Sequence, residues 1–109
     1  MVYDMDVYAL IWRANKNDDE FDQSEFDARM PRLFEWLKNL KSNGHLIACG
    51  GGGFENSSGG LTLIYAESPE QAHELSKGTP LNEIGSTEIL FWGVFYAELS
   101  LLDNIHKIT

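Results

Sequence analysis

The order of strand-like and helix-like segments constrains the fold more than any other feature of the sequence. Strand-type residue patterns occur in four segments, which are residues 3–14, 45–49, 61–66 and 87–98. Helical spacing of apolar residues occupies residues 24–43 and 68–78, after the first and third of these segments. The resulting βαββαβ order predicts an α+β, ferredoxin-like sandwich, in which two helices cover one face of a four-stranded antiparallel sheet.

Both helical segments carry recognisable end signals. The first begins with a capping-box-like run at Ser24 and ends at Gly44, and we expect Pro31 to kink it or to begin a second helix there. Its expected apolar face is formed by Phe26, Met30, Leu33, Leu37 and Leu40. The second helix is expected to start after Ser68 and to end at Gly78.

The first and last strand-like segments are apolar on both faces. One face of the pair holds six large side chains, namely Tyr8, Leu10, Trp12, Trp92, Val94 and Tyr96. Two short helices cannot cover all six, and a monomer rarely exposes a large apolar sheet face to water. We therefore expect a homodimer that forms through the sheet faces, with the two sheets closing an α/β barrel.

The stretch GHLIACGGGGFENSSGG, residues 44–60, holds seven of the ten glycines of the chain. It is not a phosphate-binding loop, because it joins two strands rather than a strand and a helix and contains no lysine. We expect residues 51–58 to form a mobile hairpin tip that is able to close over a cleft, with Phe54 as its large apolar anchor.

Length and charge limit the classes of partner. A chain of 109 residues is long enough for one domain, which we place at residues 1–98, with a tail at 99–109 that packs on the domain or on a dimer partner. Eight basic against seventeen acidic side chains give a formal charge of −9, which disfavours nucleic acid and anionic membranes. The single cysteine, Cys49, and the lack of a signal-like start predict a cytoplasmic protein.

Two runs of sequence resemble one known family. The run LKNLKSNGHLIACGG at residues 37–51 and the run GGLTLIYAESPEQAHELSKGTPL at residues 59–81 are similar, in order and spacing, to motifs of the YciI-like (YCII-related) family of dimeric α/β barrels. The resemblance implies a homodimer with a small-molecule cleft between the sheet and the helices.

The chain departs from this family where its chemistry is expected. Family members commonly carry a histidine and an aspartate that resemble an acid/base dyad, and the matching positions here hold Leu33 and Thr79, which cannot exchange a proton near neutral pH. No catalytic residue is assigned, and we expect a binding protein that is non-catalytic or altered in its chemistry.

Two other functions stay open. The first is an enzyme of the lactone isomerase, dehydrochlorinase or cofactor-free monooxygenase type that acts on aromatic-derived metabolites, with His45, Glu83 or Cys49 as the proton carrier. The second is a protein interaction module.

Eight residues are candidates for contact with a small acidic or aromatic ligand: Arg13, Arg29, Leu33, Cys49, Gly50, Phe54, Thr79 and Trp92. An arginine suits a ligand carboxylate, although salt bridges to the surplus acidic residues are the alternative role of Arg13 and Arg29. No cofactor is expected. No metal is expected either, because the acidic residues at 15–26 lack the glycine and terminal glutamate of a calcium loop.

Overall fold

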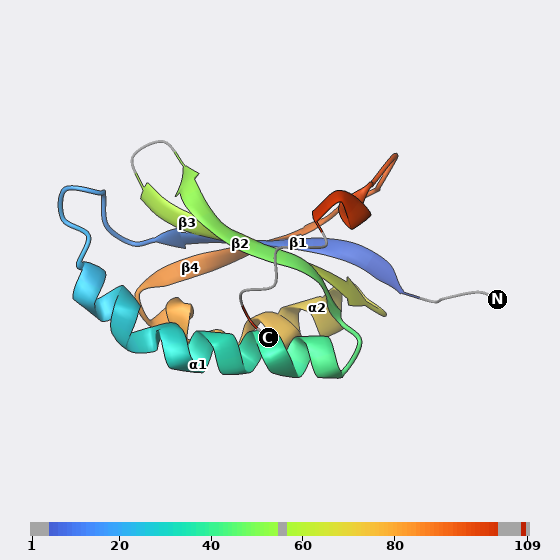
Figure 1. The fold of residues 1–109 in the computed structure, drawn as a ribbon, viewed down its shortest axis with the longest axis horizontal. Coiled ribbons are helices and arrows are strands. Elements are labelled where there is room, and N and C mark those ends of the chain that lie inside the picture. The colour runs from blue at the N-terminus through green and yellow to red at the C-terminus, as the bar shows by residue number, and fades with distance from the viewer. Residues whose placement is uncertain (1–4, 55–56, 103–107, 109) are drawn as a thin grey trace.

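A computed structural model describes residues 5–54, 57–102 and 108 of the chain. The elements follow in the order β1 (Asp6–Ala14), α1 (Gln23–Ser42), β2 (Leu46–Phe54), β3 (Ser57–Ala66), α2 (Pro69–Ser76), η1 (Pro80–Glu83), β4 (Gly85–Phe91) and η2 (Leu99–Leu102). The four strands form one antiparallel sheet in the order β2-β3-β1-β4. Figure 1 shows both α-helices on the same face of this sheet, which confirms the ferredoxin-like α+β sandwich.

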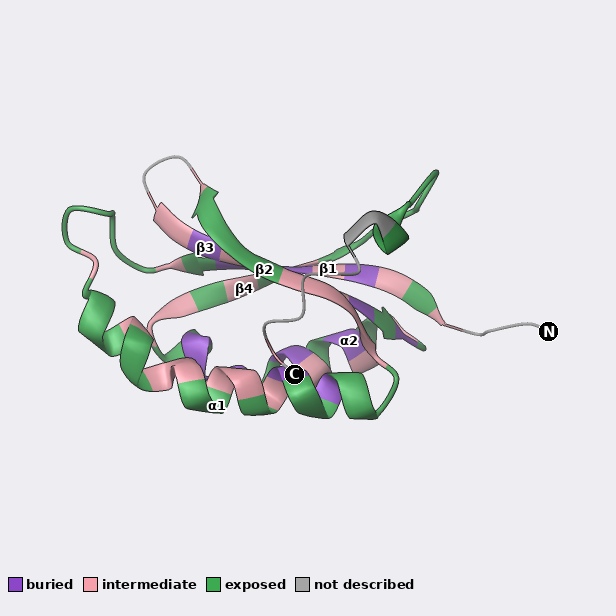
Figure 2. Ribbon diagram, viewed as in Figure 1, coloured by how far each residue is buried: buried purple, intermediate pink, exposed green. Residues whose placement is uncertain are grey.

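The sheet has an inner face toward the helices and an outer face away from them. Tyr8, Leu10 and Trp12 of β1 are buried on the inner face, which is where the hydrophobic core lies. Val7, Ala9 and Ile11 alternate with them, on the outer face, and are half-buried. Figure 2 shows the buried and half-buried colours alternating along β1.

The expectation that Tyr8, Leu10 and Trp12 need cover from a second chain is therefore wrong. They pack beneath the helices, because their register on β1 matches inward-facing residues on both neighbouring strands, such as Ile64 opposite Tyr8 and Ile89 opposite Leu10.

Helix α1 is one continuous helix of 20 residues. Its N-cap is Asp22 rather than Ser24, because a carboxylate oxygen of Asp22 accepts a 2.9 Å hydrogen bond from the Ser24 backbone N–H. Pro31 lies inside the helix and does not divide it. The side chains of Leu37 and Leu40 are buried against the sheet.

The glycine-rich stretch is strand rather than a loop over residues 51–54 and 57–58, which corrects that expectation. Gly51 pairs with Gly60 and Gly52 with Gly59, so the β2–β3 ladder continues to Phe54 and Ser57. The ring of Phe54 lies so close to Gly59 that a Cβ at that position would collide with it. The tip at residues 55–56 lies outside the described residues.

The last strand is shorter than the predicted segment 87–98. It ends at Phe91, opposite Tyr8, and Trp92 adds a final 2.9 Å backbone hydrogen bond to Val7. The ladder between β1 and β4 therefore ends close to Asp6, the first residue of β1. Residues 92–98, here called the C-terminal arm, are exposed and lack regular structure, and the side chain of Phe95 is fully exposed.

Helices of the kind that cross a lipid bilayer are absent from residues 5–54 and 57–102, where none is both long and apolar enough to do so.

Candidate functional site

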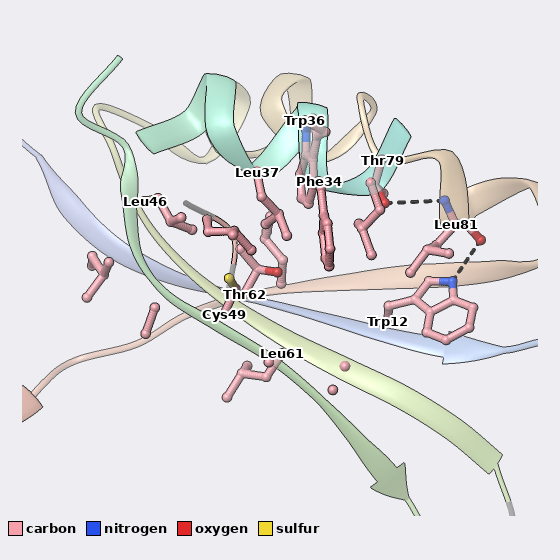
Figure 3. A pocket seen from close by; sticks show the side chains of 18 of the residues that line it. Trp12, Phe34, Trp36, Leu37, Leu46, Cys49, Leu61, Thr62, Thr79 and Leu81 are labelled. Atoms are coloured by element: carbon pink, nitrogen blue, oxygen red, sulfur yellow. Dashed lines mark hydrogen bonds between the residues drawn. The ribbon is translucent and has the colours of Figure 1, made fainter. Parts of the chain in front are cut away.

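A partly enclosed cavity of about 750 Å³ lies between α1 and the sheet (Figure 3). One wall is α1, the opposite wall is the β2–β3 hairpin, and Trp12 of β1 meets Leu81 of η1 at one end. Small-molecule pockets in proteins have volumes of roughly 300–1,000 Å³, so the cavity is large enough for a ligand of that class.

One face of α1 contributes side chains along most of the helix. Phe26, Met30, Leu33, Leu37 and Lys41 all line the cavity. Their spacing of three or four residues places them in a row on one face of the helix. The first and last are 15 positions apart, which corresponds to about 22 Å along the helix axis at 1.5 Å per residue. The cavity therefore follows the helix over most of its length.

The hairpin wall changes character along its length. Cys49 of β2 pairs with Thr62 of β3, and both side chains face α1 (Figure 3). Two positions further along the hairpin, Gly51 pairs with Gly60 and also lines the cavity. We call these two residues the glycine floor, because the hairpin presents only backbone atoms to the cavity at this point.

Within the glycine floor, Gly60 is closely packed, whereas Gly51 has open space where a side chain would be. A Cβ at Gly60 would lie 3.1 Å from the carbonyl oxygen of Gly50, which is closer than nearly all real Cβ contacts. A Cβ at Gly51 would meet only the carbonyl oxygen of Gly59, at 3.9 Å, so it would project freely into the cavity. The absent side chain at Gly51 therefore adds volume to the site.

Hydrogen bonds fix the end of the cavity near η1. Trp12 Nε1 donates to the carbonyl oxygen of Leu81 at 2.8 Å, and both residues are buried. The Thr79 hydroxyl oxygen caps η1 by accepting a 3.3 Å hydrogen bond from the Leu81 backbone N–H (Figure 3). These contacts hold the indole ring and the 3₁₀ turn against each other.

The cavity wall is almost free of charge. Among the described residues, Lys41 is the one charged residue that lines it, and it is exposed in the last turn of α1. Burial raises the pKa of the Cys49 thiol above its ordinary value of 9.0, so this thiol is protonated at neutral pH. No group of three possible metal-ligating side chains occurs in the parts of the chain that the structure describes.

Four of the eight predicted ligand-contact residues line the cavity: Leu33, Cys49, Gly50 and Thr79. Leu33 and Thr79 occupy the positions where the family resemblance placed an acid/base dyad. Thr79 supplies its hydroxyl to the backbone of Leu81, and Leu33 is half-buried on α1. The other four predicted residues do not belong to the cavity wall.

Two of these four lie together on the outer face. The Arg13 guanidinium lies 5.2 Å from the centre of the Phe54 ring and forms a 3.0 Å ion pair with Glu88. Trp92 belongs to the exposed C-terminal arm.

The fourth, Arg29, is held by two carboxylates. It contacts Glu25 at 2.7 Å and Glu83 at 2.9 Å, and its side chain is only 16% exposed. Arg29 thus joins α1 to η1. For both Arg13 and Arg29, the salt bridge is the role that the structure displays.

The three residues considered as proton carriers are dispersed. His45 contacts the Tyr65 carbonyl oxygen through Nδ1 at 2.9 Å and is not part of the cavity wall. Glu83 also lies outside that wall, and hydrogen bonds from Arg32 and Arg29 lower its pKa from 4.5 to about 2. Of these three residues only Cys49 lines the cavity, and its raised pKa keeps it as a thiol at neutral pH, which neither attacks as a nucleophile nor accepts a proton.

Sequence reasoning missed several cavity residues, above all Thr62. Helical spacing identified Phe26, Met30 and Leu37 as an inward-facing row, but it assigned them to the core rather than to a cavity wall. Thr62 lies between two leucines in a strand. Only its register opposite Cys49 and Leu10 shows that it faces α1.

Comparison with protein-family models gives a match to the YCII-related domain over residues 7–91. Comparison with curated proteins gives no match. The matched segment contains the whole sheet except for the first residue of β1, together with α1, α2 and η1. On this evidence the chain belongs to the YCII-related domain family.

Proposed function

We propose that this protein binds an uncharged, predominantly apolar small molecule in the cavity between α1 and the β2–β3 hairpin, and that it does not catalyse a reaction there. The observation that carries this proposal is the nearly charge-free wall of a cavity of about 750 Å³. An apolar ligand gains free energy by leaving water for such a site. The aromatic side chains of Trp12, Phe26 and Phe34 in the wall favour a ligand that contains rings.

Binding without turnover agrees with the protonation states of the site. Leu33 and Thr79 cannot transfer a proton at neutral pH, and Cys49 is held as a thiol. The arginines that would suit an acidic ligand are engaged with Glu88, Glu25 and Glu83. For this reason we propose an uncharged ligand rather than a carboxylate.

Titration with N-phenylnaphthylamine tests this proposal, because this uncharged dye becomes fluorescent in apolar surroundings. We expect saturable binding to the wild type. The variant Gly51→Val places two methyl groups in the cavity and should bind about tenfold more weakly. The matched control is Gly53→Val on the same strand, where a Cβ would meet only the Ser57 carbonyl oxygen at 3.8 Å and where the residue does not line the cavity.

The Gly53→Val variant should bind the dye as the wild type does. Equal binding by Gly51→Val and Gly53→Val would contradict the proposed site. The absence of any saturable fluorescence increase with the wild type would contradict the proposed function itself.

We also propose that the protein is a homodimer that forms through the outer faces of the two sheets. Leu61, Tyr65 and Leu90 are each at least 40% exposed on that face, beside the half-buried Leu63 and Ile11. Such a patch is unusual on a monomer. Apolar residues of the C-terminal arm, Phe95 among them, add to the exposed apolar surface.

Light scattering on a size-exclusion column tests the dimer. The wild type should have twice the protomer mass of 12.3 kDa. Leu90→Glu introduces a charge on the outer face and should give the protomer mass, whereas Lys38→Glu on the exposed side of α1 should remain a dimer. A wild type that has the protomer mass at all concentrations would overturn this proposal.

We propose a cytoplasmic location for the protein. Cys49 has no second cysteine with which to form a disulfide within the chain, which suits a reducing compartment. Cell fractionation tests this, and recovery of the protein only outside the cytoplasm would contradict it.

A further inference from the structure

The two indole N–H groups in the cavity wall are already occupied. Trp12 Nε1 donates to the Leu81 carbonyl oxygen at 2.8 Å, and Trp36 Nε1 donates to the Leu75 carbonyl oxygen at 3.0 Å. An indole has a single N–H donor and no acceptor. Neither tryptophan therefore has a hydrogen-bonding group left for a ligand, although both rings offer apolar surface.

Three hydroxyl groups of the wall are also engaged. Thr79 accepts from the Leu81 backbone N–H at 3.3 Å, and Thr87 donates to Asn82 Oδ1 at 2.6 Å. Ser100 donates to Glu98 Oε1 at 2.8 Å. Each of these hydroxyls already has one partner within the chain, so each is a poorer first choice as a ligand anchor than a hydroxyl that has none.

Thr62 differs from the other hydroxyl residues of the wall. It is half-buried on β3, opposite Cys49, and its hydroxyl forms no hydrogen bond with another described residue of the chain. Figure 3 shows Thr62 and Cys49 side by side beneath α1. A partly buried hydroxyl gains free energy when it acquires a hydrogen-bonding partner, whereas the neighbouring thiol is only a weak donor and acceptor.

Lys41 offers a competing anchor for an anionic ligand. It is exposed in the last turn of α1, where the negative end of the helix dipole repels an anionic ligand. The formal charge of −9 on the chain also repels anions. An exposed ion pair contributes little to affinity, so Thr62 is the stronger anchor.

We propose that the ligand carries one uncharged oxygen group, a hydroxyl or a carbonyl, which hydrogen-bonds to Thr62 while its apolar body lies over the glycine floor. This inference rests on the proposed function and defines the class of ligand more closely. Thr62 has the Cys49 thiol beside it, and Gly51 and Gly60 lie two positions along the hairpin. A ring system that extends from the Thr62 hydroxyl along the hairpin thus meets only backbone beneath it.

Competition against N-phenylnaphthylamine with three related compounds tests the inference: biphenyl, para-hydroxybiphenyl and biphenyl carboxylate. For the wild type we expect hydroxybiphenyl to bind about fivefold more tightly than biphenyl, as one net hydrogen bond predicts, and the carboxylate to bind most weakly. Thr62→Val keeps the shape of the side chain and removes the hydroxyl. It should abolish the preference while retaining the affinity for biphenyl, which also shows that the variant is folded.

Thr62→Ser is the matched control, because it keeps the hydroxyl and should keep the preference for hydroxybiphenyl. Equal wild-type affinities for biphenyl and hydroxybiphenyl would overturn the role of Thr62 and leave the proposed function intact. A preference that persists in Thr62→Val would do the same, and tightest binding of the carboxylate would overturn the uncharged class. Failure of every compound, the dye included, would contradict the proposed function as well.

Discussion

Trp12 of β1 donates a hydrogen bond of 2.8 Å from its indole N–H to the carbonyl oxygen of Leu81 in η1, and both residues are buried. The contact joins two segments that are 69 residues apart in the sequence. It positions an aromatic ring at one end of the cavity and fixes the 3₁₀ turn that carries Thr79 at its N-cap. The stability of the sandwich and the shape of the site therefore depend on the same hydrogen bond.

Replacement of Trp12 by Phe should lower the free energy of unfolding by about 1–3 kcal/mol. It removes the indole hydrogen bond to the buried Leu81 carbonyl oxygen, which keeps only the 3.0 Å bond from the Ile84 backbone N–H, and it leaves space where the larger indole ring packed. Urea denaturation measures this loss. The matched control is Trp92→Phe, since the Trp92 indole N–H has no hydrogen-bond partner among the described residues and its ring is exposed. That variant should lie within about 0.5 kcal/mol of the wild type. Equal stability of the two variants would contradict the importance of the Trp12–Leu81 contact.

Gly78 controls the position of Trp36 in the cavity wall. A Cβ at Gly78 would lie 2.6 Å from Trp36 Cδ1 and 2.7 Å from Trp36 Nε1, so Gly78→Ala must displace the ring and weaken its hydrogen bond to Leu75. We expect a loss of about 1–3 kcal/mol in unfolding free energy and weaker dye binding.

The control for Gly78→Ala is Gly53→Ala, where a Cβ makes only an ordinary contact of 3.8 Å. Urea denaturation and dye titration of both variants provide the comparison. Wild-type stability and affinity in Gly78→Ala would show that Trp36 does not need its present position.

Cys49 should react slowly with iodoacetamide. Burial raises the pKa of its thiol above 9.0, and only the thiolate is nucleophilic, so alkylation near pH 8 should lag behind that of free cysteine. Saturating N-phenylnaphthylamine should slow it further, because the thiol lines the cavity. Mass spectrometry over time measures both rates. Alkylation faster than that of free cysteine, or unaffected by the dye, would contradict this description of the site.

The ion pairs of Glu83 should make the thermal stability of the protein depend on pH in the acidic range. Hydrogen bonds from Arg32 and Arg29 lower the pKa of Glu83 from 4.5 to about 2 in the folded protein. Because the folded pKa is depressed, this stabilisation is fully present above about pH 4.5 and is lost as the pH falls toward about 2. Thermal unfolding should therefore show a lower Tm for Glu83→Gln than for the wild type near pH 7, with the difference shrinking in that acidic range.

Glu35→Gln is the control for this pH series, since Glu35 is exposed on the same helix as Arg29 and Arg32 and makes no ion pair with another described residue. Its Tm should follow that of the wild type throughout. A difference between wild type and Glu83→Gln that stays constant down to the lowest pH would contradict the assigned cause.

The fold was largely predictable, because apolar periodicity records which residues are buried. The order of elements and the inward row of α1 followed from that periodicity, whereas the family was predicted from the resemblance of residues 37–51 and 59–81 to its motifs. The predictions failed where backbone pairing between distant segments determines the secondary structure. The segment 87–98 has strand-forming residues throughout, yet β4 stops at Phe91, where its ladder with β1 ends at Tyr8.

In the glycine-rich stretch, pairing between distant segments extends a strand beyond its predicted end instead of shortening it. Glycine has low strand propensity, and so residues 51–58 were expected to form a loop. Pairing between β2 and β3 overrides that propensity, and the close packing of the Phe54 ring on Gly59 depends on the missing side chain.

The candidate site was predictable only in part for a related reason. Thr62 has no local signal, and whether Arg29 is free for a ligand depends on Glu83, which is 54 residues away.

The location of a bound ligand tests the central claim most directly. NMR of the complex between N-phenylnaphthylamine and protein with labelled leucine methyl groups distinguishes the cavity from the apolar outer face. We predict intermolecular NOEs from the dye to the methyl groups of Leu33 and Leu37, which line the cavity. NOEs confined to Leu63 and Leu90 of the outer face would contradict the account.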